Sequence, residues 1–273
     1  MIVRFILALL ILTLSGCTTD PIADRYKEYS EHSIWVGLSR HRYRVFEPSD
    51  RDPNEKLPVI LFLHGSAARG AENEYQLGDF SFLMPKDRAN FHFLVVLPQC
   101  PPGQFWLGEN NEIAIQALES TINQYNGDRS RLYLIGYSMG GYGVWQMAVD
   151  HPGEFAALVS VAGGVSSLPT LEPGLKVDLA DEGKDPYATV AERIGPTPVW
   201  MFHGDMDETV SVEESRHLYA ALKEVGRSDV RYTEMKGIGH VSSIKAFGDP
   251  ELLPWLAKQS AASFSAANSR PTQ

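Results

Sequence analysis

Short apolar runs alternate with longer amphipathic segments along the chain. Runs rich in branched and aromatic residues predict buried strands at 57–63, 91–97, 132–135, 156–162, 198–203 and 230–235. The segment 41–46 alternates as an edge strand does. Helical spacing of apolar residues predicts helices at 109–125, 212–225 and 251–258, with a short one at 187–193. Strands alternating with helices predict an α/β fold with a mostly parallel, doubly wound sheet flanked by helices.

The segment 131–144, RLYLIGYSMGGYGV, predicts a buried strand that enters a helix through a very tight turn. Its centre is a G-x-S-x-G pattern around Ser138, and this context is typical of a nucleophile elbow. A side chain at Gly136 or Gly140 would collide with the neighbouring strand or with the start of the helix. The alternative is that Ser138 only caps the helix. The flanking strand and helix favour the nucleophile.

A serine nucleophile needs a base, and the base needs an acid that orients it. In this kind of fold the order along the chain is serine, acid, histidine, which leaves His217 and His240 as candidate bases. His217 lies off the apolar face of its predicted helix, so we expect it to be solvated. His240 lies in the loop GIGH after a strand, where glycines let the backbone present the ring. The sequence therefore favours His240.

Two carboxylates compete as the orienting acid in the segment HGDMDETV. Asp205 follows its strand closely and is expected to bond to nearby backbone. Asp207 has room to reach the ring of His240 and is the preferred acid. His64 and His203 each precede a glycine at a strand end, and no carboxylate–histidine cluster surrounds them. We interpret both as structural turn residues.

The length, composition and net charge limit the class of protein to which this chain can belong. The 273 residues suffice for one large α/β domain. The net charge of −10 and the lack of a basic cluster argue against a nucleic-acid partner, and the acidity suits solubility. No metal or cofactor is implied, and the oligomeric state is left open. Of the two cysteines, Cys100 is expected to be a small buried residue and not a nucleophile.

The amino terminus has the pattern of a processing segment. An apolar run at 5–14 ends in Leu14-Ser15-Gly16-Cys17, and small residues before a cysteine resemble the lipobox of bacterial lipoproteins. The resemblance implies a signal peptide at 1–16, a lipid on Cys17 and a periplasm-facing envelope protein. Thr18, rather than aspartate, favours the outer membrane. We expect a tether at 17–33, the domain at 34–258, an excursion or small lid at 165–196, and a disordered tail at 259–273.

The chain resembles the α/β-hydrolase superfamily, specifically the secreted bacterial esterases and predicted peptidases related to polyhydroxybutyrate depolymerases and prolyl-oligopeptidase-type catalytic domains. The stretches that carry the resemblance cover most of 41–258: PVILFLHGSAARGAEN, VVLPQCPPGQFW, RLYLIGYSMGGYGVWQMAVDHPGEFAALVSVAGG, PVWMFHGDMDETVSVEESRHLYAALK, RYTEMKGIGH and DPELLPWL. By position, the resemblance implies a triad of Ser138, Asp207 and His240. It also implies an oxyanion hole made by the N–H groups of Ser66 and Met139. The segment 165–196 departs from the family pattern, because it is longer than the corresponding link in close relatives.

The favoured function is a serine carboxylesterase that acts on small or medium esters through an acyl-enzyme. A prolyl-oligopeptidase-type peptidase is the alternative, although this chain length leaves no room for an N-terminal propeller. The third possibility is a non-catalytic binding protein on a hydrolase scaffold. The intact triad argues against this possibility. Loops after the strand ends are expected to wall the substrate pocket. Trp106 is the first candidate, with Tyr75 and Gln99 next, followed by Phe80, Phe105, Leu168, Leu171 and Tyr187.

Overall fold

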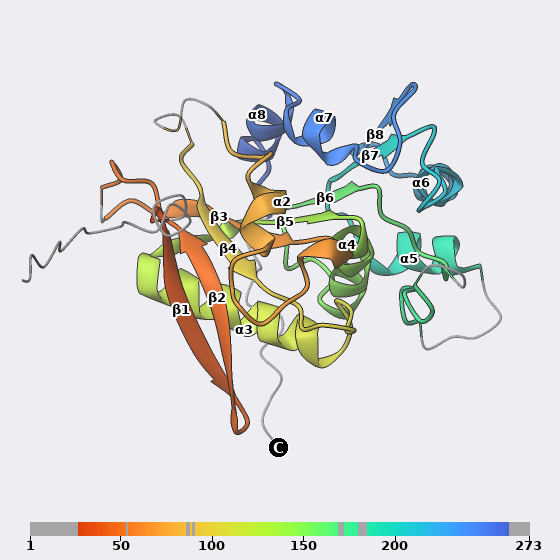
Figure 1. Cartoon of the computed structure of the whole chain (residues 1–273). Coiled ribbons are helices and arrows are strands. Elements are labelled where there is room, and N and C mark those ends of the chain that lie inside the picture. Colours follow the sequence, from red (N-terminus) through yellow and green to blue (C-terminus); the bar gives the residue numbers. More distant parts are fainter. Residues whose placement is uncertain are drawn as a thin grey trace, which may run out of the picture.

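A mixed sheet forms the centre of the protein in the computed structural model, which describes residues 27–52, 54–85, 88, 91–168, 172–179 and 185–261 (Figure 1). Its strands are β1 (Tyr29–Val36), β2 (Ser39–Phe46), β3 (Leu57–Leu63), β4 (Leu94–Pro98), β5 (Gly127–Tyr137), β6 (Ala157–Val161), β7 (Val199–Gly204) and β8 (Val230–Met235). They lie in the order β1-β2-β4-β3-β5-β6-β7-β8. The β1–β2 and β2–β4 pairs are antiparallel, and the others are parallel.

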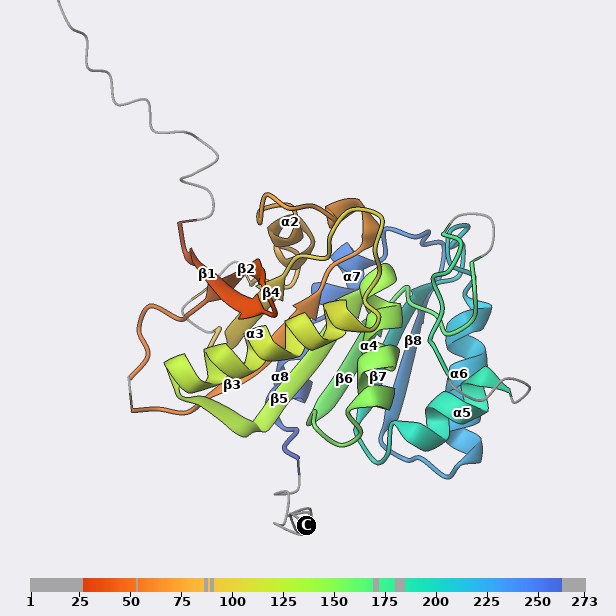
Figure 2. The ribbon, with the colours of Figure 1, turned by 90° about the horizontal axis from the view of Figure 1, so that it is seen from below.

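Helices cover both faces of this sheet. One face packs against α3 (Glu109–Tyr125), α4 (Met139–Asp150), α5 (Pro186–Arg193) and α6 (Glu213–Glu224). The other packs against α2 (Gln76–Phe80), α7 (Ser243–Phe247) and α8 (Leu252–Ala257). Figure 2 shows the first group in front of the sheet. A 3-10 turn, η1 (Ser66–Ala68), follows β3.

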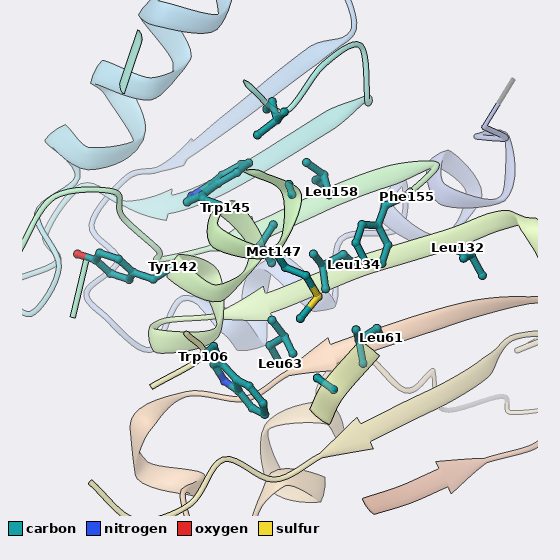
Figure 3. Close-up of a cluster of buried hydrophobic side chains, with 14 of the residues drawn as sticks. Leu61, Leu63, Trp106, Leu132, Leu134, Tyr142, Trp145, Met147, Phe155 and Leu158 are labelled. Carbon is teal, nitrogen blue, oxygen red and sulfur yellow. The ribbon is translucent and has the colours of Figure 1, made fainter. Parts of the chain in front are cut away.

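The central strand β3 illustrates how burial on both faces specifies the fold. Successive side chains of a strand point to opposite faces, so a strand covered on both sides is apolar throughout. Leu61 and Leu63 join the core beneath α3 and α4, whereas Ile60 and Phe62 join the core on the opposite face. Figure 3 shows the first core, where Trp145 of α4 packs above the sheet.

The predicted fold class is confirmed, as are the predicted strands and helices apart from shifts at their ends. The prediction that 41–46 forms the edge strand is wrong, because β1 pairs with β2 and occupies that edge. The sequence did not predict strand β1, because most of its residues are exposed or half-buried. Its sequence, YSEHSIWV, therefore has no apolar run. Because β1 begins at Tyr29, the domain also starts inside the predicted tether at 17–33.

The carboxyl end of the domain lies slightly beyond the predicted boundary at 258. Ala261 donates its N–H to Ser130 O at 2.8 Å, so residues 259–261 pack on the domain instead of belonging to the tail. The predicted signal peptide, Cys17 and residues 262–273 lie outside the described residues. Within the described ranges, no helix combines the length and apolarity needed to cross a membrane.

Candidate active site

The turn between β5 and α4 places Ser138 at the carboxyl end of the sheet. Ser138 has φ 54° and ψ −117°, a strained conformation for a residue other than glycine. A Cβ at Gly136 would overlap the carbonyl of Gly140 at the helix start, and one at Gly140 would overlap the carbonyl of Leu63 in β3. Both collisions are those predicted from the sequence. The glycines therefore let the strand, turn and helix approach closely enough to expose the serine.

Ser138, His240 and Asp207 form one hydrogen-bonded chain although they come from three separate loops. Ser138 Oγ lies 2.8 Å from His240 Nε2, and His240 Nδ1 lies 2.8 Å from Asp207 Oδ2. An ionised carboxylate can only accept, so His240 Nδ1–H is the donor to Asp207. This leaves Nε2 free to accept the Ser138 hydroxyl proton. The arrangement can transfer a proton from serine to imidazole.

The Asp207 carboxylate is surrounded by hydrogen-bond donors. Its Oδ1 accepts the N–H groups of Thr209 and Val210, each at 2.9 Å. Its Oδ2 lies 2.8 Å from His240 Nδ1 and 3.3 Å from His203 Nε2. Burial by itself raises the pKa of Asp207, but the hydrogen bonds from His203 and His240 hold that pKa well below its ordinary value. The carboxylate is therefore an anion at neutral pH.

Asp205, the competing acid, contacts backbone, but its partner lies in a distant loop and not in the nearby turn that the sequence predicted. Its Oδ1 accepts the N–H of Gly237 at 2.6 Å, in the loop that carries His240. The preceding Gly204 is also close to this loop, because a Cβ there would overlap the carbonyl of Ile238. These two contacts fix the loop after β8 against the loop after β7. Asp205 thus supports the position of His240 without touching its ring.

The other candidate base, His217, lies away from Ser138 on the exposed side of α6. Its side chain is 58% exposed and lies 3.9 Å from Glu213. Its ring packs edge-on against Tyr187, with the centroids 5.1 Å apart. The expectation that His217 is a solvated helix residue is confirmed.

The N–H groups of Ser66 and Met139 lie at the starts of η1 and α4, respectively. N–H groups in a first helical turn have no intrahelical acceptor, and no described residue accepts from either of these. The two turns are in contact, since a Cβ on Gly140 would overlap the carbonyl of Leu63 and touch that of His64. Two free donors therefore flank the serine turn, where the oxyanion hole was predicted.

His64 and Asp79 hold the loop that carries Ser66. His64 Nε2 accepts the N–H of Cys100 at 2.9 Å, so the Nδ1–H donates to Gly65 O at 2.7 Å. Burial lowers the pKa of His64 to about 4, which keeps the imidazole neutral. Asp79 Oδ2 accepts the Gly65 N–H at 2.8 Å. The structural role expected for His64 is confirmed, and its partner Asp79 was not predicted.

The first-choice pocket residue, Trp106, is a core residue. Its side chain is 2% exposed, and its Nε1–H donates to His64 O at 3.0 Å. The indole packs edge-on against the His64 ring at 5.0 Å and beneath Gly143 of α4 (Figure 3). The prediction that Trp106 forms an open pocket wall at Ser138 is therefore wrong. Two prolines and a glycine stiffen its loop, but they direct the indole inward.

Gln99 and Phe80, two further predicted pocket residues, support neighbouring backbone and fill the core, respectively. Gln99 braces neighbouring backbone: its Oε1 accepts the Asn73 N–H at 2.7 Å, and its Nε2 donates to Ala68 O at 3.0 Å. Tyr75 is 62% exposed at the start of α2, whereas Phe80 is fully buried in the core. The sequence does not distinguish a pocket residue from a core residue here, because aromatic side chains in loops pack against the core as often as they bind ligands.

The described parts of the excursion after β6 contact α4, where Gln146 Nε2 donates to Asp178 O at 3.3 Å, and the loop after β3. Glu172 pairs with Arg69 at 3.2 Å, and the Arg69 guanidinium lies 5.0 Å from the centroid of the Phe105 ring. Arg69 Nε also lies 3.2 Å from Met139 Sδ, next to the serine turn. The segment therefore reaches the edge of the site through Glu172. Leu168 and Tyr187 pack against the core, and Leu171 lies outside the described residues.

Two groups that support the site, one half-buried and one buried, were missed by sequence reasoning. The Tyr137 hydroxyl donates to His240 O at 3.1 Å, and burial raises the pKa of Tyr137 to about 12. Glu214 of α6 accepts the N–H groups of Val165 and Ser166 at 2.7 and 3.0 Å, which holds the start of the excursion. Tyr137 occupies a variable position of the elbow pattern, and Glu214 lies on a helix. Neither position carries a sequence signal.

Cys100 is buried, as predicted, and burial raises the pKa of its thiol to about 12. A neutral buried thiol is a poor nucleophile. Across the described residues, no three His, Cys, Asp or Glu side chains are grouped as ligands for a metal ion.

A family profile described as the alpha/beta hydrolase fold matches residues 58–188. The chain is 26% identical over 243 residues to a poly(3-hydroxyoctanoate) depolymerase from Pseudomonas fluorescens, covering 77% of this chain and 79% of that protein. It is 28% identical over 178 residues to poly(3-hydroxyalkanoate) depolymerase C from Paucimonas lemoignei, covering 56% of this chain and 41% of that protein. A thermostable esterase structure superposes with a TM-score of 0.73 at 29% identity, covering 88% of this chain and 64% of that one.

The chain therefore has the α/β-hydrolase fold, and it is similar to proteins described as depolymerases and as an esterase. The chain spans less than two thirds of the Paucimonas depolymerase and of the thermostable esterase, at 41% and 64%.

Proposed function

We propose that the protein is a serine hydrolase that cleaves carboxylic esters through an acyl-enzyme. The observation that carries this proposal is the continuous hydrogen-bonded chain from Ser138 Oγ through His240 to Asp207, with both links at 2.8 Å. Its position at a strained turn beside two free N–H donors adds the groups that an acyl transfer needs. The relatives named as depolymerases and as an esterase support an ester as the bond that is cleaved.

In the proposed mechanism, Ser138 Oγ attacks the ester carbonyl while its proton passes to His240 Nε2. The Ser66 and Met139 N–H groups stabilise the negative oxygen of the tetrahedral intermediate. Asp207 holds the ring and stabilises the imidazolium without taking its proton. His240 then protonates the leaving alcohol, and a water activated by the same imidazole releases the acid.

The test is a panel of p-nitrophenyl esters of increasing chain length, run beside aminoacyl-proline amides on wild type and Ser138→Ala. We expect ester turnover by wild type, labelling of Ser138 by a fluorophosphonate, and loss of both in the variant by orders of magnitude. Faster cleavage of the amides would instead favour a peptidase. Absence of labelling and turnover would favour a binding protein on a hydrolase scaffold.

We further propose that the enzyme is a lipoprotein of the bacterial cell envelope, facing the periplasm and anchored through Cys17. The support is the sequence Leu14-Ser15-Gly16-Cys17 after an apolar run. Mass spectrometry of the mature amino terminus tests it. We expect a lipid-modified chain that begins at Cys17 and an unlipidated product from Cys17→Ser. A mature chain with another first residue would contradict the anchor.

A further inference from the structure

The β1–β2 hairpin extends beyond the rest of the sheet. β1 and β2 pair along their whole lengths, but β2 pairs with β4 only over Tyr43–Phe46. The outer half of the hairpin therefore has no second neighbour among the described strands, and Figure 1 shows its end projecting past α3. A two-residue turn, Gly37-Leu38, closes the hairpin, and Gly37 supplies the positive φ of 58° that such a turn needs.

This end of the hairpin exposes two large apolar side chains. Leu38 is 97% exposed, and Trp35 is 67% exposed. The other four of the five tryptophans in the chain are at most 7% exposed. Turn positions ordinarily carry Gly, Asn, Asp or Ser, so the turn itself gives no reason for a leucine. The two side chains do not stabilise the core, which indicates that they contact something outside the domain.

A cation lies beside the exposed indole. Trp35 and Arg40 are directly opposite in the β1–β2 register, and opposite residues of an antiparallel pair lie on the same face of the sheet. Arg40 is exposed. Within the described part of the hairpin, Glu31 pairs with Arg42 and Arg44, and it does not pair with Arg40. The end of the hairpin is therefore locally cationic, although the chain has a net charge of −10.

We propose that the hairpin tip, defined as Trp35, Leu38 and Arg40, inserts into the surface of a bilayer that contains anionic lipid. Indole rings concentrate at the membrane–water interface, where an apolar body and a polar N–H are both accommodated. Leu38, at the apex, enters the acyl region. Arg40 keeps its stem on the apolar side and its guanidinium at the lipid phosphates.

The length of the anchor permits this contact. The proposal rests on the lipid proposed for Cys17, because two apolar side chains alone hold a domain at a membrane only weakly. Fully extended, the chain from Cys17 to Tyr29 spans at most ~43 Å, whereas the eight residues of β1 span ~26 Å. A bilayer that holds Cys17 is thus within reach of the tip. The anchor also makes insertion an intramolecular event with a high effective concentration.

The test uses the full chain purified from membranes and reconstituted in vesicles of phosphatidylcholine and phosphatidylglycerol. The acyl chains carry bromine near the headgroup, which quenches only nearby indoles, and the same lipids without bromine give the reference emission. Trp35 is the reporter, because the other tryptophans are buried. Trp35→Phe identifies its share of the emission. Mass spectrometry of the same preparation establishes whether Cys17 carries a lipid.

Two variants change the tip, and one changes a distant surface. Leu38→Glu places a charge at the apex, and Arg40→Glu reverses the charge beside the indole. Val225→Glu is the matched control, since Val225 is a 43% exposed apolar residue directly after α6, on the other side of the molecule from β1 (Figure 1). Thermal unfolding establishes that each variant is folded.

We expect bromine to remove more than about half of the Trp35 emission in wild type and in Val225→Glu, because an interfacial indole lies at the headgroup level. Leu38→Glu and Arg40→Glu should each reduce this loss at least about twofold, since a carboxylate is repelled by anionic lipid and excluded from the acyl region. The proposal is overturned if the lipid-modified wild type is not quenched, a result that leaves the anchor intact. It is equally overturned if both tip variants are quenched as wild type is. A chain without lipid on Cys17 overturns the anchor and this proposal together.

Discussion

His203 Nε2 lies 3.3 Å from Asp207 Oδ2, and both side chains are completely buried. The same nitrogen lies 3.0 Å from Val210 O, while His203 Nδ1 lies 2.7 Å from Ser215 Oγ. Because Val210 O and the carboxylate can only accept, Nε2 carries a proton and faces both oxygens. His203 thus contacts the same carboxylate oxygen, Oδ2, as His240 does.

This contact predicts that His203 positions the acid. His203→Met removes the donor at similar volume, so we expect kcat to fall about tenfold for a lost hydrogen bond to a charged group, with KM nearly unchanged. In His203→Gln the side-chain amide can still donate, and kcat should recover in part. Steady-state kinetics on a p-nitrophenyl ester measures both. Equal losses in the two variants, or a change confined to KM, would show that His203 only fills space.

The two candidate acids should differ sharply in sensitivity. Asp207→Asn should lower kcat by ~10³–10⁴-fold, since only a carboxylate fixes the tautomer in which His240 accepts from Ser138. Asp205→Asn keeps an oxygen that can accept the Gly237 N–H, so we expect less than a ~10-fold loss. Measurement of kcat for both variants decides the assignment. The reverse ranking would transfer the role of acid to Asp205.

His64 should make the protein sensitive to acid. Its pKa is lowered by burial from 6.5 to about 4, so the unfolded chain binds the proton more readily between these pH values. Its contribution to stability is therefore complete above pH 6.5 and declines by up to about 3 kcal/mol as the pH falls to 4. Urea unfolding of wild type and His64→Gln over this range measures the difference. Parallel curves of unfolding free energy against pH would contradict the prediction.

Trp106 should matter for stability rather than for substrate choice. Trp106→Ala leaves a cavity beneath His64 and α4, which should lower the free energy of unfolding by ~3–5 kcal/mol. Trp106→Phe keeps an aromatic ring in the core but loses the indole N–H bond to His64 O and part of the ring volume. We expect a cost of ~1–3 kcal/mol for it, below that of the alanine variant, and an unchanged profile of ester chain lengths. If the folded Trp106→Phe variant prefers a different ester chain length from wild type, Trp106 contacts the substrate after all.

The sequence by itself specified the fold class and the serine turn. Both depend on local physical requirements that leave a mark on the chain. A strand covered on both faces is apolar at every position, as β3 is. A turn that brings a strand and a helix into contact needs glycine at 136 and 140, where a Cβ would overlap backbone. The order of Ser138, Asp207 and His240 then narrowed the other two site residues to a few choices.

Only the tertiary structure decided which side chains meet across long separations in sequence. Asp205 and Asp207 are two residues apart and chemically alike, and only their contacts with Gly237 and His240 separate their roles. The direction in which loop aromatics point was likewise undetermined, so Trp106 was assigned to the pocket although it belongs to the core. Strand β1 was missed for a related reason. It is half-exposed and has no apolar run, so its pairing with β2, and not its own sequence pattern, specifies it as a strand. Periodicity reports burial of a local segment, whereas contacts between distant segments depend on how the whole chain packs.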